Sequence, residues 1–165
     1  MGKELERLTE LFKKLGAADP SGWASSQLEE GIPQLERYLF LRQAWRSVVP
    51  EDDHGWIAAS IAAWRKQPDG PYAGVGRALH RLQQSGAAAE DLTDLVRGMQ
   101  AELLFQFCYQ LEDPGELEEE VADTAWGLFR VNEDGEAAEP ITGLHESVLE
   151  TDPTGREMRP RQLPG

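Results

Sequence analysis

Residues 91–113 read DLTDLVRGMQAELLFQFCYQLED, and this stretch decides the predicted fold. Its first half has apolar residues at the three- and four-residue spacing of an amphipathic helix: Leu92, Leu95, Val96, Met99 and Leu103. Its second half is apolar almost all round, apart from a polar stripe of Glu102, Gln106 and Gln110. A helix this long spans roughly 36 Å, about the width of a domain of this size. We therefore predict a long central helix, buried on most sides in its second half, around which the other segments pack.

Further amphipathic stretches lie on both sides of this helix. Asp19-Pro20 is a helix start signal, an N-cap followed by proline at the first helical position, and Gly31 is the matching stop. Asp113 and Glu116 have the spacing of a capping box at the start of a last helix. The expected helices are 3–15, 20–31, 33–48, 53–66 and 73–84 before the central helix, and 114–124 after it.

The helix expected over 33–48 carries three arginines that differ in their predicted burial. Arg37 and Arg46 are expected to face water. Arg42 lies between Leu41 and Trp45, where it either sits partly buried beside a carboxylate or lays its stem along the aromatic surface with its charged head in water.

The character of the chain changes after Thr124. Residues 126–131 (WGLFRV) are aromatic and β-branched, residues 132–135 (NEDG) are typical of a hairpin turn, and Ile141 lies in the expected return strand. The predicted fold class is therefore mainly α: a helical bundle of six to seven helices around a long central helix, with a small C-terminal β-hairpin. We expect residues 1–151 to form a single domain and residues 152–165 to form an extended, partly disordered basic tail.

Charge narrows the classes of partner. The 165 residues carry a net charge of −14, and residues 112–139 hold eleven acidic side chains and one basic one, Arg130. An acidic surface repels phosphate backbones, which disfavours nucleic acid as a partner. No apolar run is long enough to cross a membrane, and the single cysteine, Cys108, leaves no intramolecular disulfide and fits a cytoplasmic protein. The acidic segment is either a solvated face or a docking surface for a basic protein.

The best candidate site surrounds His145. Glu146, Asp152, Arg156 and Arg159 follow it closely in sequence, and a histidine beside carboxylates can act as a base or hold a divalent ion. The HExxH spacing of zinc enzymes is not met, however, and Ser147 lacks the glycines of a nucleophile elbow. We therefore assign no catalytic residue, no metal ligand and no cofactor. The alternative is a polar loop that fastens the C-terminal segment to the helices.

Two stretches carry a family resemblance. Residues 91–105 (DLTDLVRGMQAELLF) and 143–160 (GLHESVLETDPTGREMRP) resemble segments of a family of small acidic bacterial proteins. The resemblance implies a bacterial cytoplasmic protein. It supplies no activity, cofactor or catalytic residue.

Two functional hypotheses follow. The leading one is a non-enzymatic cytoplasmic protein-interaction protein, such as an adaptor, accessory or immunity-like protein, that binds a partner with a basic surface through its own acidic surface. The alternative is a small-molecule- or metal-binding protein, or an enzyme, with its site around His145. The sequence leaves open whether the chain forms a homo-oligomer.

Overall fold

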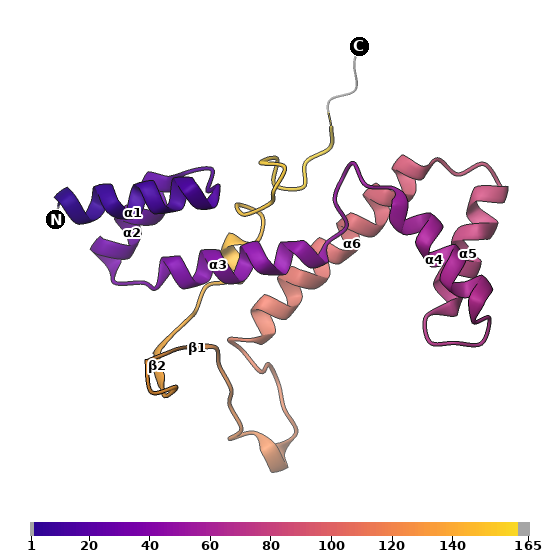
Figure 1. The fold of residues 1–165 in the computed structure, drawn as a ribbon. Coiled ribbons are helices and arrows are strands. Elements are labelled where there is room, and N and C mark those ends of the chain that lie inside the picture. The colour runs from indigo at the N-terminus through magenta and orange to yellow at the C-terminus, as the bar shows by residue number, and fades with distance from the viewer. Residues whose placement is uncertain (1, 162–165) are drawn as a thin grey trace. The chain divides into compact units, whose positions relative to one another are not determined.

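The computed structural model describes residues 2–161, and over this range the chain is mainly helical (Figure 1). Its six α-helices are α1 (Gly2–Leu15), α2 (Pro20–Glu30), α3 (Gln34–Ala44), α4 (Gly55–Lys66), α5 (Ala73–Gln84) and α6 (Ala89–Gln110). Strands β1 (Phe129–Val131) and β2 (Ala137–Pro140) form a two-stranded antiparallel sheet. The predicted fold class, helices with a small C-terminal hairpin, is confirmed.

The chain divides into two compact units. One consists of Met1–Trp45 with Ala101–Gly165, and the other of Arg46–Gln100. Helix α6 belongs to both, because the division falls between Gln100 and Ala101. No helix within residues 2–161 has the length and apolar character needed to cross a membrane.

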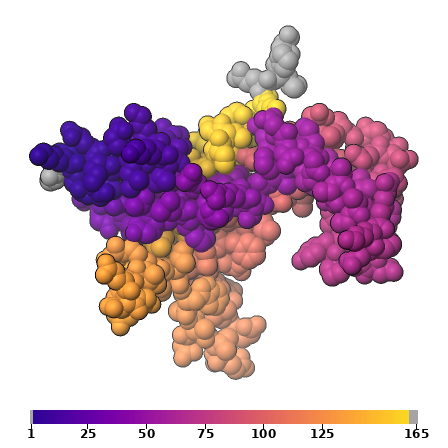
Figure 2. All heavy atoms as spheres, in the orientation of Figure 1, coloured from indigo at the N-terminus to yellow at the C-terminus, as the bar shows by residue number. Residues whose placement is uncertain are grey.

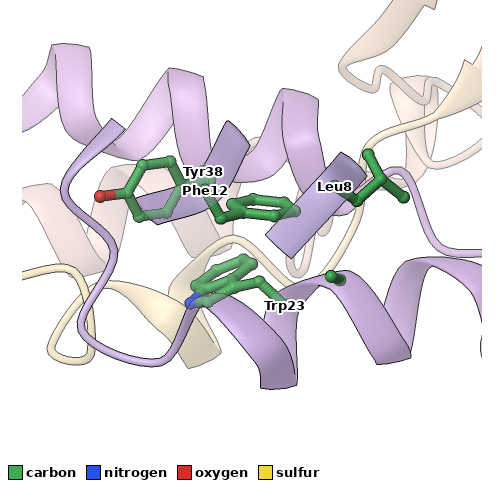
Figure 3. Packing of buried hydrophobic residues seen from close by; sticks show 5 residues of the cluster. Leu8, Phe12, Trp23 and Tyr38 are labelled. Atoms are coloured by element: carbon green, nitrogen blue, oxygen red, sulfur yellow. The ribbon is translucent and has the colours of Figure 1, made fainter. Parts of the chain in front are cut away.

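The core of the first unit joins α1, α2 and α3 through aromatic rings (Figure 3). Phe12 stacks on Trp23 with ring centroids 5.9 Å apart, and Tyr38 meets both rings edge-on, at 5.7 Å from Phe12 and 5.3 Å from Trp23. Leu8, one turn before Phe12, is buried in the same cluster. The apolar stripe predicted for the first helix is therefore the face that packs against α2 and α3.

The ends of α2 agree with the predicted signals. The Asp19 carboxylate accepts a hydrogen bond from the backbone N–H of Gly22 at 2.9 Å, and Pro20 is the first helical residue. Gly31 ends the helix with φ of +71°, a left-handed conformation that glycine adopts without a Cβ penalty.

The hairpin also follows its predicted turn. The Asn132 side-chain oxygen accepts hydrogen bonds from the N–H groups of Asp134 and Glu136, and Gly135 has φ of +80°. The return strand ends at Pro140, one residue before the expected Ile141, which is buried and donates its N–H to the carbonyl of Leu128 at 2.8 Å. This bond extends the pairing of the hairpin by one residue beyond each strand, to a position where the chain is buried.

The helix predicted over 114–124 is wrong. Only a single 3-10 turn, Glu119–Val121, forms there. The Asp113 carboxylate accepts from the N–H of Gly115 at 2.8 Å, closing a tight turn in which Gly115 has φ of +71°, instead of capping a helix. Three consecutive glutamates beyond this turn repel one another and bury nothing, so no packing stabilises a helix there.

The second unit is built on the α4–α5 pair. Its core contains Ile57, Ile61, Leu79 and Leu92. The two helices approach closely at Gly76, where an added Cβ would overlap the carbonyl oxygen of Ser60 and lie 2.6 Å from Cβ of Trp64. Gly74, in the first turn of the same helix, has open space at the corresponding position.

These two glycines provide a matched test of the packing. We expect Gly76→Ala to lower the free energy of unfolding by about 1–3 kcal/mol, because backbone and Cβ atoms cannot move aside for the new methyl group. We expect Gly74→Ala to be neutral or to stabilise by up to about 1 kcal/mol, through better helix propensity. Urea unfolding followed by far-UV circular dichroism measures both. Equal effects from the two substitutions would contradict the close approach at Gly76.

Two predictions about burial are corrected. In the second half of α6 the apolar side chains do not all lie inside: Ala101 and Cys108 are buried, whereas Leu103 is 50% and Phe107 56% exposed. In α3 the arginine that is buried is Arg37, which had been expected to face water, and Arg42 is exposed. The partners of Arg37 come from distant sequence, which the local pattern does not reveal.

Candidate functional site

His145 lies against the C-terminal half of α6. It begins a 3-10 turn, His145–Ser147, and its ring meets Phe105 and Tyr109 edge-on, with ring centroids 5.7 and 5.1 Å away. Its Nδ1 lies 3.4 Å from the Glu112 carboxylate, which accepts the N–H of Leu144 at 2.8 Å. The Nδ1 atom is buried and makes no hydrogen bond of good geometry, so the ion-pair distance reflects proximity only. These contacts fasten the turn to α6.

Glu146 faces a different partner, the buried Arg37. A Cβ built on Gly143 would lie 2.8 Å from Nη2 of Arg37 and 3.2 Å from Oε2 of Glu146, so both charged groups meet at this glycine. Burial lowers the pKa of Arg37 below its ordinary value, and the negative charge of Glu146 opposes that change. Glu146 thus partly compensates a buried cation.

Asp152 organises the C-terminal turn. Its buried carboxylate accepts hydrogen bonds from the N–H and hydroxyl of Thr154, at 3.1 and 2.6 Å, and from the N–H of Met158 at 3.0 Å. In the same turn the Nε of Arg156 donates to the carbonyl of Arg159 at 3.4 Å, and Arg159 pairs with Glu157 at 2.7 Å. Residues 153–158 are therefore folded into turns around Asp152. The part of the predicted tail beyond residue 161 lies outside the described residues.

The contacts described for the five predicted site residues do not bring them together in one site. His145 contacts α6, and Glu146 lies near Arg37. Asp152, Arg156 and Arg159 make their contacts within the C-terminal turn. Within residues 2–161 no group of three or more histidine, cysteine or carboxylate side chains could hold a metal ion. The contacts around His145 join the C-terminal segment to α6, whereas the hydrogen bonds described for Asp152 lie within its own turn.

A groove on α6 was missed by the sequence interpretation. It has a volume of about 490 Å³ and is lined by Leu103, Phe105, Gln106, Phe107, Tyr109 and Gln110. On the helix, Gln106 and Gln110 lie between Leu103 and Phe107 on one side and Phe105 and Tyr109 on the other. The predicted polar stripe is thus the amide floor of a groove with apolar walls. No sequence signal distinguished this exposed face from the buried one, because the helix is apolar on both sides of the stripe.

The C-terminal end of the groove is defined by two hydrogen bonds. The Trp126 indole donates to the carbonyl of Gln110 at 2.6 Å, which brings the segment after α6 back to the helix end. The Tyr109 hydroxyl donates to Asp113 at 3.1 Å, and this bond raises the pKa of Tyr109. The groove therefore ends where the acidic segment begins.

The acidic segment is exposed. Figures 1 and 2 show the loop that leaves the end of α6. Within this loop Glu118, Glu119, Glu120 and Asp123 are exposed. The segment's one basic residue, Arg130, pairs with Glu139 at 2.6 Å. Its charge is therefore already neutralised locally, and the negative charge of residues 116–123 is left facing water.

Negative charge gathers at the end of α6, and the positive charge of Arg37, which acts on Glu112, balances only part of it. The carbonyl end of a helix carries a partial negative charge that favours cations. Here the last turn contains no basic residue, and Glu112 and Asp113 follow at once. A cation supplied from outside would relieve this repulsion.

Cys108, on the buried face of the same helix, is a core residue. Its side chain is fully buried, and burial together with the charge of Glu112 raises the pKa of the thiol to about 11. It is therefore protonated and unreactive at neutral pH.

Two features thus distinguish this part of the molecule: an exposed groove with apolar walls on α6, and an acidic segment that starts at its end. Both belong to the first compact unit. The resemblance to small acidic bacterial proteins gives no information about the groove or the acidic segment. The bacterial cytoplasmic protein that it implies remains a prediction. Comparisons with protein-family models, with curated proteins and with solved structures each found no match for this chain.

Proposed function

We propose that this protein is a non-enzymatic interaction protein, of the adaptor, accessory or immunity-like kind, that binds a basic surface of another protein through residues 112–139. The observation that carries the proposal is the exposed acidic segment at the carbonyl end of α6, where charge and helix dipole repel each other. Proteins keep such locally unfavourable arrangements at functional sites. A basic partner would turn the repulsion into attraction and speed association. The proposal places the protein in the bacterial cytoplasm, where its buried thiol stays reduced.

The proposal is tested by capture with charge-matched variants. The tagged 165-residue chain is incubated with extract of its native host at about 50 mM salt, where surface charges are weakly screened. We expect it to retain a basic protein that elutes as the salt is raised. The variant Glu118→Gln/Glu119→Gln/Glu120→Gln should lose that protein. The control Glu6→Gln/Glu10→Gln/Glu29→Gln removes the same charge from exposed positions on α1 and α2 and should retain it.

Binding of the purified partner then gives the rate constants. The association rate constant should fall by about tenfold in the acidic-segment variant, since charges at an interface act mainly on association. Recovery of no partner at low salt would count against the proposal. An equal loss of partner binding in the control variant would also contradict the proposal, because net charge and not the acidic segment would then determine binding.

A further inference from the structure

We propose that the groove on α6 binds the apolar face of a basic amphipathic helix. This inference rests on the proposed function and specifies which element of the partner is recognised. The walls are Leu103 and Phe107 on one side and Phe105 and Tyr109 on the other, and all four are large apolar or aromatic side chains. Side chains of this kind are the usual anchors of protein interfaces.

The groove is too open to enclose a small molecule. Leu103 is 50%, Phe107 56% and Tyr109 46% exposed, although all three line it. Pockets for small ligands bury most of the ligand surface, and walls that are themselves half in solvent cannot do so. A helix needs less enclosure, since only one of its faces is covered.

The spacing of the walls suits a helix. Leu103 and Phe107 are four residues apart, about 6 Å along the helix axis. Apolar side chains at positions i, i+3 and i+4 of a partner helix repeat at the same distance and can interdigitate with them. The amides of Gln106 and Gln110, on the floor, can hydrogen-bond to polar groups at the edge of that face.

Charge selects a basic helix. Glu102 lies one turn before Gln106 on the same exposed side, and Asp113 lies at the opposite end of the groove. The exposed glutamates 118–120 continue the negative charge beyond that end. Lysine and arginine side chains lay their stems along apolar surface and reach outward with their charges, so they can meet carboxylates at both ends.

The same charges argue against a second copy of this chain as the occupant. Each copy carries a net charge of −14, much of it in the segment that begins at the groove. Pairing two grooves would bring two acidic segments together, and like-charge contacts across an interface are costly. The isolated protein is therefore expected to be a monomer.

The inference is tested with designed peptides and the 165-residue protein. The probe is a fluorescein-labelled peptide of about 18 residues, some five helical turns, made of leucine and lysine with the leucines on one helical face. One control peptide has the same composition in scrambled order, and the other carries glutamate in place of lysine. Fluorescence anisotropy should show the amphipathic basic peptide binding at least about tenfold more tightly than either control, a difference of about 1.4 kcal/mol.

Matched protein variants locate the binding surface. The double substitution Leu103→Ala/Phe107→Ala should weaken binding of the amphipathic peptide by about tenfold or more and should leave the affinity for the scrambled peptide unchanged. Val75→Ala/Leu82→Ala removes two exposed apolar side chains from α5 and should change neither. Circular dichroism confirms that both variants keep their helices.

The outcomes separate this inference from the proposed function. If the amphipathic and scrambled peptides bind equally, with affinity lost only in the Glu118→Gln/Glu119→Gln/Glu120→Gln variant, the groove inference is overturned and acidic recognition stands. If no basic peptide binds at about 50 mM salt, both are overturned. If light scattering shows a dimer that Leu103→Ala/Phe107→Ala dissociates, a second copy occupies the groove and the inference is overturned.

Discussion

Replacing Phe12 with alanine is expected to lower the free energy of unfolding by about 3–5 kcal/mol, the usual cost of truncating a fully buried phenylalanine. The Phe12 side chain has no exposed surface and packs against the rings of Trp23 and Tyr38, which also contact each other (Figure 3). Its loss would leave a cavity where α1, α2 and α3 meet and would remove two aromatic contacts, each worth about 0.5–1.5 kcal/mol beyond area burial. Close packing around the site leaves little room for collapse.

The matched control is Phe107→Ala on α6. It deletes the same ring from a site that is 56% exposed, so we expect a change within about 0.5 kcal/mol. Urea unfolding, followed by far-UV circular dichroism and by tryptophan fluorescence, measures both variants. Two probes are needed because the chain has two compact units that can unfold separately. A loss for Phe12→Ala no larger than for Phe107→Ala would contradict the three-helix core.

Local signals in the sequence were sufficient wherever the structure depends on neighbouring residues. The stripe of α1, the Asp19 cap, the Gly31 stop and the Asn132–Gly135 turn all act over a few residues, and all are found as predicted. Such signals need no knowledge of distant partners, because helix caps and tight turns are satisfied by adjacent backbone groups.

The predicted helix over 114–124 shows where local signals conflict. Asp113 and Glu116 have the spacing of a capping box, but Pro114-Gly115 also favours a tight turn, in which the Asp113 side chain accepts from Gly115. The choice depends on whether a buried face follows. Leu117 is only partly buried and Val121 is 43% exposed, so the segment lacks the packing that stabilises most helices in proteins.

The candidate site depended on information that periodicity does not contain. The second half of α6 is apolar on both sides of its polar stripe, and the pattern alone cannot say which side is covered. In the structure Ala101 and Cys108 are buried, while the opposite side forms the groove. The sequence therefore predicted the helix itself but not which of its faces is exposed, and it placed the candidate site at His145, whose ring meets Phe105 and Tyr109 edge-on.

The burial of Arg37 also could not be predicted from periodicity. Substitution of Arg37 has the second largest effect that we expect on stability. Its guanidinium donates to Gln34 at 3.0 Å, to the Ser147 hydroxyl at 3.1 Å and to the Gly143 carbonyl. Two of these acceptors lie more than a hundred residues away in sequence, so no pattern within α3 could have separated Arg37 from the exposed Arg42. The planar fork of arginine can serve several acceptors at once.

We expect Arg37→Ala to lower the free energy of unfolding by about 3 kcal/mol, because it leaves buried acceptors unsatisfied and removes the cation that faces Glu146. Arg42→Ala, on the exposed side of the same helix, should change it by no more than about 0.5 kcal/mol. Arg37→Lys should fall between them, since it keeps the charge without the fork. Urea unfolding measures all three, and equal stability of the two alanine variants would contradict the buried network.

The network also connects the fold to the groove. Arg37 holds residues 143–147, and this turn holds the His145 ring against Phe105 and Tyr109, which form one wall. Amide hydrogen exchange in Arg37→Lys, at a temperature where the protein remains folded, should therefore be faster at Ser147 and Val148 than in the native protein. Affinity for the amphipathic basic peptide should fall in the same variant, because a wall released from its support must be ordered again on binding. Faster amide exchange with unchanged peptide affinity would show that Phe105 and Tyr109 bind the peptide without support from the His145 turn.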